Sequence, residues 1–177
     1  RPISQATLAY GYGVSVTALQ LARAYAALAG DGSVPEISLL KRDAPPEAER
    51  VIRPESARAV RRMLEEVVRP GGTGTKASVA GYRIAGKTGT AWKSGPGGYS
   101  EDKYISIFAG LAPASEPRLA AVVMIDEPGG ELYYGSDVAA PVFADVMTEA
   151  LRLLAVPPDA LPARDPGSVI QAMAGKQ

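Results

Sequence analysis

A lysine, two threonines and a glycine occupy four consecutive positions near the middle of the chain, as Lys87-Thr88-Gly89-Thr90. They combine a positive charge, two hydroxyl groups and one position without a side chain, a set of groups that suits a ligand with a small carboxylate. In an extended strand, Lys87 and Gly89 point to one face and the two threonines to the other. Gly89 would let a ligand lie close against the backbone. The sequence therefore predicts a ligand-binding strand here.

The pattern Ser-x-x-Lys, in which a lysine one helical turn after a serine can take the serine's proton, occurs at residues 38–41 and 100–103. Neither copy is expected at the start of a helix. On a strand, residues three apart face opposite sides, so Ser38 and Lys41 could not act as a pair. Ser100 is expected in a turn before a strand, as a surface serine. The chain is therefore expected to lack its own nucleophile.

A second pattern points to a different chemistry, because residues 81–88 satisfy G-x-x-x-x-G-K-[ST] and residues 119–126 form an apolar run that ends in aspartate. A phosphate-binding loop of this kind needs flexible backbone followed by a helix that begins at the Gly-Lys pair. Residues 82–85 favour a strand, and the glycines and proline that follow Thr88 prevent a stable helix. The sequence therefore argues against a nucleotide-binding site.

The amino-acid composition excludes several classes of catalytic and metal site. The chain has 177 residues, 46% of them hydrophobic, with 19 basic and 19 acidic side chains and neither cysteine nor histidine. Asparagine is also missing. These absences disfavour a Ser-His-Asp hydrolase, a zinc site and disulfides, and we expect no cofactor or metal. The balanced charge predicts no nucleic-acid partner. The first residue is not Met, so we expect an internal piece of a longer protein whose targeting segment lies upstream.

The elements that must position the Lys87 strand follow from residue patterns. Helices are predicted over residues 15–29, from Pro54 to the residue before Pro70, and over 137–154. Strands are predicted over 37–40, 82–93, 103–111 and 118–126, the last two as a hairpin-linked pair. Residues 43–50 are predicted as a surface loop, 71–76 as a flexible loop, and 157–177 as a mobile tail. This order predicts an α+β fold in which helices pack on an antiparallel sheet.

Taken with the Lys-Thr-Gly element, further segments resemble the transpeptidase domain of class B penicillin-binding proteins, most closely the division-specific members of Gram-negative bacteria. The similar stretches are residues 6–29, 110–113, 133–135 and 140–143. The resemblance covers about residues 6–155 and implies the penicillin-binding transpeptidase fold, which is also that of serine β-lactamases. Residues 1–156 would be the C-terminal part of that domain, and residues 157–177 a flexible tail.

The resemblance also implies an activity: acyl transfer that cross-links the D-Ala-D-Ala stem peptides of peptidoglycan during septal wall synthesis, inhibited covalently by β-lactams. It implies that Lys87 and Thr90 take part in catalysis, with the Thr90 N–H as an oxyanion donor. The residues that it implies for substrate binding are Thr88, Gly89, Tyr12, Tyr104, Tyr133 and Tyr134. Ordinary half-buried tyrosines are an equal alternative for the last four. Trp92 is expected to be exposed and receives no role, and Asp126 and Glu127 are expected to form a solvated strand end.

In this family the nucleophilic serine with its lysine, and an S-x-N element, precede the Lys-Thr-Gly element. The chain is therefore interpreted as a C-terminal fragment that needs the N-terminal remainder of the same protein. The resemblance further implies the periplasmic face of the inner membrane, an upstream transmembrane anchor and divisome membrane proteins as partners. A β-lactam sensor or β-lactamase of the same fold, and a non-catalytic partner-binding domain, remain open as alternatives.

Overall fold

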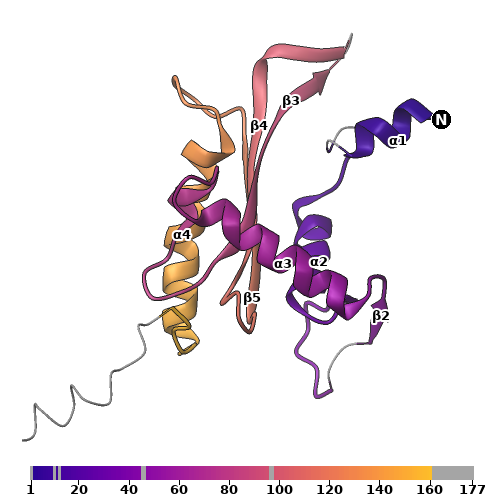
Figure 1. The fold of residues 1–177 in the computed structure, drawn as a ribbon. Helices are drawn as coiled ribbons and strands as arrows, with labels where there is room; N and C mark the ends of the chain where they lie inside the picture. Colours follow the sequence, from indigo (N-terminus) through magenta and orange to yellow (C-terminus); the bar gives the residue numbers. More distant parts are fainter. Residues whose placement is uncertain (1, 10, 12, 45–46, 96–97, 161–177) are drawn as a thin grey trace, which may run out of the picture.

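The computed structural model describes residues 2–9, 11, 13–44, 47–95 and 98–160, without the side chains of residues 2–4 and 101. Its centre is an antiparallel sheet with strand order β3-β4-β5, formed by β3 (Ala85–Gly95), β4 (Gly98–Ala112) and β5 (Leu119–Asp126). Helix α4 (Gly135–Leu153) covers one face, and α2 (Ala18–Ala29) covers the other (Figure 1). Helix α3 (Pro54–Val68) crosses beside β3. This arrangement confirms the predicted α+β fold and leaves β3 at a sheet edge within the described part of the chain.

Side chains along β4 point alternately to the two faces of the sheet, and each face carries a hydrophobic cluster. Phe108 is fully buried on the α4 face, where its ring lies 4.7 Å from that of Phe143. Leu111 is fully buried on the α2 face, against Tyr25 and Leu28. Because both faces of β4 pack against helices, the middle of the sheet, to which β3 is paired, is buried on both sides.

The predicted helices are confirmed with small changes at their ends. Helix α2 begins at Ala18 rather than residue 15, because Thr17 forms a capping box in which its side chain and that of Gln20 each bond the other's backbone N–H. Helix α3 begins at Pro54, which occupies the first turn where a missing N–H costs nothing. A helix that the sequence did not reveal, α1 (Pro2–Ala9), precedes α2.

The predicted strand over residues 37–40 is wrong. Leu39 and Leu40 are 96% and 81% exposed, and the Ser38 hydroxyl donates to the Leu40 carbonyl at 2.8 Å, which closes a local turn instead. The two strands of this region flank residues 37–40 instead. Strand β1 (Ser33–Pro35) precedes them and pairs with β2 (Ala48–Arg50), which lies inside the segment 43–50 that was predicted as a loop. Apolar residues alone did not make a strand, because within the described residues no partner strand lies beside them.

The two competing motifs can now be placed. Ser100 lies within β4 and not in a turn, and its hydroxyl donates to Asp102 at 2.7 Å. Neither Ser-x-x-Lys copy starts a helix, as predicted. Strand β3 continues from Gly86 through Thr88 to its end without giving way to a helix, which contradicts a phosphate-binding loop.

The segment 71–76, predicted as a flexible loop, is hydrogen-bonded back to α3 through Gly74 and leads into a short 3-10 helix, η1 (Thr75–Ala77).

The start of the predicted tail is attached to the body of the domain. Val156 is buried, and the Asp159 carboxylate accepts hydrogen bonds from the backbone N–H of Arg83 at 2.7 Å and from the Ser115 hydroxyl at 2.7 Å. Residues 161–177 of that predicted tail lie outside the described residues. Among the described helices, none combines the length and apolar character that crossing a membrane would require.

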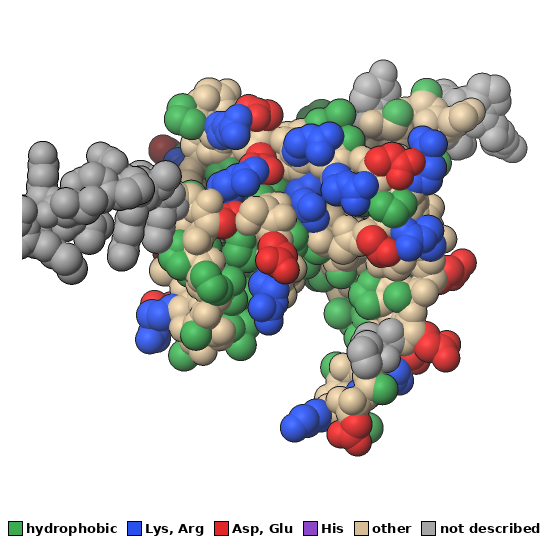
Figure 2. All heavy atoms as spheres, turned by 60° about the horizontal axis from the view of Figure 1, so that its bottom comes forward, with side chains coloured by type: hydrophobic (Ala, Val, Ile, Leu, Met, Phe, Trp, Pro, Cys, Tyr) green, Lys and Arg blue, Asp and Glu red, His purple; other side chains and the backbone are tan. Residues whose placement is uncertain are grey.

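One face of the molecule mixes both signs of charge. Figure 2 shows Lys and Arg side chains gathered across its upper part, with Asp and Glu side chains between them and hydrophobic side chains exposed below. One acidic side chain is instead buried: Glu65 is only 6% exposed and accepts three bonds of 2.7–3.0 Å from the partly exposed Arg83. The pair ties α3 to the segment that leads into β3.

Candidate active site

The ammonium group of Lys87 lies among hydroxyl and carbonyl groups at the edge of β3. Its Nζ donates to the Thr88 carbonyl at 3.0 Å and to the Thr88 Oγ1 at 3.2 Å. The Thr73 Oγ1 lies 3.3 Å from the Thr88 Oγ1. Among the described residues, no acidic side chain forms an ion pair with Lys87. A cation with hydroxyl neighbours and no carboxylate partner is available for an anionic ligand.

Thr90 is held by the first residue of α4. The Gly135 backbone N–H donates to the Thr90 Oγ1 at 3.0 Å. A hydroxyl that accepts this bond retains its own O–H as a donor. The approach is tight, because a Cβ on Gly135 would lie 2.4 Å from the carbonyl oxygens of both Gly89 and Ile107. The N-terminus of α4 therefore orients the Thr90 hydroxyl so that its proton can be given to a ligand.

A cavity of about 500 Å³ follows the edge and the α2 face of β3. All four residues of the Lys-Thr-Gly-Thr element line it, and Tyr25 and Leu21 of α2 form the opposite side. A Cβ on Gly89 would be in ordinary contact, 3.6 Å from the Ile107 side chain. Burial raises the pKa of Tyr25 to about 12, so its phenol stays neutral near pH 7. Among the residues that line this cavity, Lys87 is the one with a basic side chain, and none has an acidic one.

A second, smaller pocket adjoins the first through Thr90, which lines both. Its other lining residues are Trp92, Tyr104, Tyr133 and Tyr134. The Tyr104 and Tyr133 rings are stacked with centroids 4.1 Å apart, and the Tyr133 and Tyr134 centroids are 4.5 Å apart. The hydrogen bond to the Tyr134 hydroxyl, together with burial, raises the pKa of Tyr133 to about 12. These three tyrosines form an aromatic wall beside Thr90.

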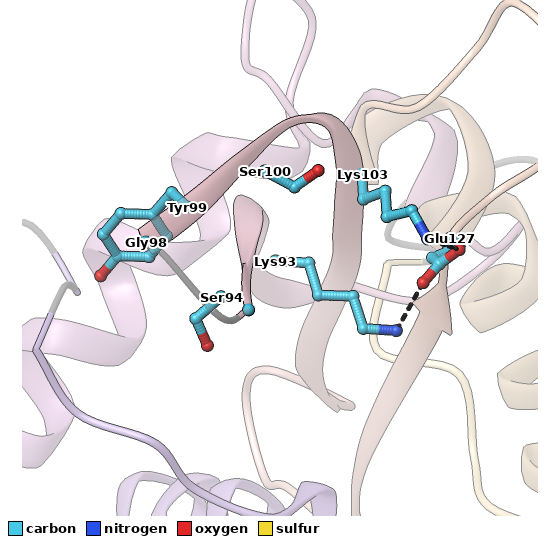
Figure 3. A pocket seen from close by; sticks show the side chains of 8 residues that line it. Lys93, Ser94, Gly98, Tyr99, Ser100, Lys103 and Glu127 are labelled. Carbon is cyan, nitrogen blue, oxygen red and sulfur yellow. Dashed lines mark hydrogen bonds and ion pairs between the residues drawn. The ribbon is translucent and has the colours of Figure 1, made fainter.

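The segment that carries Tyr133 and Tyr134 is fixed at its start by an ion cluster. Glu127 accepts from Lys93 at 2.7 Å and from Lys103 at 3.3 Å, and Lys93 also reaches Asp126 at 2.9 Å. Figure 3 shows Lys93 and Lys103 converging on Glu127 from the two strands of the β3–β4 hairpin. The hydrogen bonds to Glu127 and Asp126 raise the pKa of Lys93. Asp126 and Glu127 are exposed, as expected for a strand end, but are paired.

Two further contacts attach the Tyr133 segment and the loop that carries Thr73 to the rest of the domain. The Ser106 hydroxyl is fully buried and donates to the Tyr133 carbonyl. Lys76 of η1 donates to Asp137 in the first turn of α4 at 2.7 Å, and this bond holds the pKa of the Asp137 carboxyl below its usual value. The loop that carries Thr73 is therefore tied to the same helix that orients Thr90.

The structure brings most of the predicted site residues together along β3 and the segment before α4. Lys87, Thr88, Gly89 and Thr90 line one cavity, and the three tyrosines at 104, 133 and 134 line the adjoining pocket. The predicted substrate-binding residue Tyr12 lies outside the described residues. Trp92 is 49% exposed, as expected.

Sequence reasoning missed Thr73, Gly135 and Trp92 as parts of this site. Thr73 had a usable signal, since it lies in the glycine-rich segment 71–76 that the sequence predicts as a flexible loop. Gly135 had only its position directly after the two tyrosines.

Comparison with known proteins gives a consistent result. A family model described as the penicillin binding protein transpeptidase domain matches residues 1–148. The chain is 49% identical over 163 residues to the peptidoglycan D,D-transpeptidase FtsI of Escherichia coli K12, covering 92% of this chain and 28% of that protein. It is 44% identical over 158 residues to the probable peptidoglycan D,D-transpeptidase PenA of Neisseria meningitidis, covering 89% and 27%. The chain thus spans less than a third of these curated relatives.

Among solved structures, the transpeptidase domain of penicillin-binding protein 3 from Burkholderia pseudomallei aligns with a TM-score of 0.84 at 46% identity. The alignment covers 92% of this chain and 49% of that one. Structure and sequence therefore point to the same group of proteins, and the aligned region is about half of the solved domain.

Proposed function

This chain belongs to the family of penicillin-binding protein transpeptidase domains, and we propose that its parent protein cross-links peptidoglycan stem peptides by D,D-transpeptidation. A serine attacks the carbonyl between two D-alanine residues, and D-alanine leaves as its amine takes a proton. An amine of a neighbouring peptide then attacks the ester, forms the new peptide bond and releases the serine. The chain contributes one wall of the site for these steps.

The observation that carries the proposal is the Lys87 ammonium, which forms no ion pair within the described residues and lies beside the Thr88 and Thr90 hydroxyl groups on an edge strand. The terminal carboxylate of a D-Ala-D-Ala peptide is the anion that such a set would bind, through charge-assisted hydrogen bonds. Because Thr90 accepts from Gly135, its O–H is directed as a donor. An extended peptide can also lie along the open edge of β3, against Gly89.

The roles assigned to the remaining residues follow from their positions. The backbone N–H of Thr90 is the candidate second oxyanion donor, a contact that contributes about 3–4 kcal/mol in comparable acyl transfers. Lys87 supplies positive potential for the proton network around the serine. Tyr104, Tyr133 and Tyr134, with Tyr12 as predicted, would form the apolar wall that receives ligand side chains.

The upstream part of the parent protein would supply the nucleophilic serine, its lysine and the S-x-N element. A role in septal wall synthesis is supported by the similarity to FtsI of Escherichia coli. By the same similarity we propose a location on the periplasmic face of the inner membrane, an upstream membrane anchor and membrane proteins of the division machinery as partners. A β-lactam would enter the site as a mimic of the peptide.

The test is the intact mass of the parent protein before and after incubation with benzylpenicillin, followed by peptide mapping. We expect one stable adduct on an upstream serine, with residues 1–177 of this chain unmodified, and loss of the adduct in the Lys87→Ala variant. Release of the opened penicillin within seconds would instead identify a β-lactamase. No adduct on the folded parent protein would refute the proposed chemistry.

A further inference from the structure

The single tryptophan of the chain stands beside the proposed site. Trp92 lies on β3 two residues beyond Thr90, on the same face, and is paired across the strands with Tyr104. Its side chain is 49% exposed, and neither hydrophobic core cluster of the described residues includes it. A large aromatic side chain left half in water next to a ligand-binding strand has surface to offer a ligand.

The pocket that Trp92 lines is about 200 Å³ and its lining contains no charged side chain. Whole ligands of drug size occupy sites of about 300–1,000 Å³, so this pocket has room for one group of a ligand and not for all of it. Thr90 joins it to the cavity that holds Lys87. A ligand anchored by its carboxylate at Lys87 could therefore extend one side group toward Trp92.

The aromatic rings of the pocket differ in how much surface they leave open. Tyr104 and Tyr133 are stacked with an interplanar angle of 15°, so each covers a face of the other. Trp92 and Tyr134 remain 49% and 53% exposed. Within the described part of the chain, the indole N–H of Trp92 makes no hydrogen bond. The open ring surface of the pocket thus belongs to Trp92 and Tyr134.

We propose that Trp92 is a specificity-determining residue that favours β-lactams whose acyl side chain carries a flat aromatic ring. This inference rests on the proposed function, because the ligand must be anchored at Lys87 and Thr90. A flat ring would extend the existing stack of tyrosines in the offset or edge-to-face arrangements that aromatic pairs prefer. Tryptophan and tyrosine faces also attract ammonium groups, so the test below includes a penicillin that carries one.

The test compares two penicillins with the same bicyclic nucleus on the parent protein. Benzylpenicillin carries a phenyl ring on its acyl side chain, whereas 6-aminopenicillanic acid has no acyl side chain. We expect Trp92→Ala to lower the second-order acylation rate by benzylpenicillin about 3- to 10-fold and to leave the rate with 6-aminopenicillanic acid within about 2-fold. Trp92→Phe, which keeps a ring, should retain at least about half of the benzylpenicillin rate.

Tyr99→Ala is the matched control, because Tyr99 is an exposed aromatic residue of the same hairpin that does not line this pocket. It should leave both rates unchanged. An equal loss with both compounds, or no loss with benzylpenicillin, in a variant that melts like the wild type would overturn the inference. A larger loss with ampicillin, whose side chain adds an ammonium group, than with benzylpenicillin would also overturn it. If the unmodified protein is acylated by neither compound, the proposed function itself fails.

Discussion

Adding one methyl group at Gly135, the first residue of α4, should strongly slow acylation at the site. A Cβ at this position would lie 2.4 Å from the carbonyl oxygens of Gly89 and Ile107, whereas ordinary contacts begin at 3.4 Å. Helix α4 must then withdraw from β3 by about 1 Å, the difference between these values. The 3.0 Å bond from the Gly135 N–H to Thr90 lengthens correspondingly. Because a displacement of 1 Å can lower a rate on the order of 100-fold, we expect Gly135→Ala to slow acylation by that amount.

The assay is the second-order rate of acylation of the parent protein by a fluorescent penicillin, measured beside the melting temperature. Gly129→Ala is the matched control, since a Cβ there meets nothing within 4 Å, and it should react at the wild-type rate. Thr90→Val removes the accepting hydroxyl without crowding α4 and should reproduce most of the loss. If either Gly135→Ala or Thr90→Val is acylated at the wild-type rate, the claim that α4 orients this hydroxyl is refuted.

Three further outcomes are expected. Thr73→Val should slow acylation about 5-fold, the value of a net hydrogen bond of about 1 kcal/mol, while Thr73→Ser keeps the rate; equal rates for both variants would contradict the role of the hydroxyl. Arg83→Met should lower the free energy of unfolding in urea by about 1–2 kcal/mol, a value reduced for the partial exposure of the Arg83 side chain, because it removes three hydrogen bonds from the buried Glu65 carboxylate, and Glu65→Leu in the same protein should recover much of this. In an absorbance titration of the eight tyrosines, Tyr25 and Tyr133 should ionise near pH 12, with stability lost as pH rises from 10 to 12.

Helix α3 and the β4–β5 pair could be predicted from sequence because their signals are local. Pro54 marks the first helical turn, and the apolar runs of β4 and β5 are divided by prolines. The strand predicted over residues 37–40 failed because a strand also needs a partner, and Leu39 is almost fully exposed. A short apolar run therefore does not reveal whether another strand lies beside it.

The candidate site shows the same limit at the level of single contacts. The Lys-Thr-Gly-Thr element is contiguous, so its chemistry could be predicted directly. The bond from Gly135 to Thr90 joins residues 45 positions apart, and the contact between Thr73 and Thr88 joins residues 15 apart. Such contacts depend on how α4 and η1 pack on the sheet. No residue pattern near either threonine announces its partner.

The alternation rule was correct about the backbone of β3 but incomplete about its chemistry. Lys87 and Thr88 leave the strand on opposite faces, yet the Lys87 Nζ lies 3.2 Å from the Thr88 Oγ1. A lysine has a flexible four-carbon stem, and at the edge of a sheet no neighbouring strand prevents that stem from folding around. In a central strand the same tetrad would keep the ammonium and the hydroxyl groups apart. The position of β3 at the sheet edge is therefore what turns four consecutive residues into one binding group.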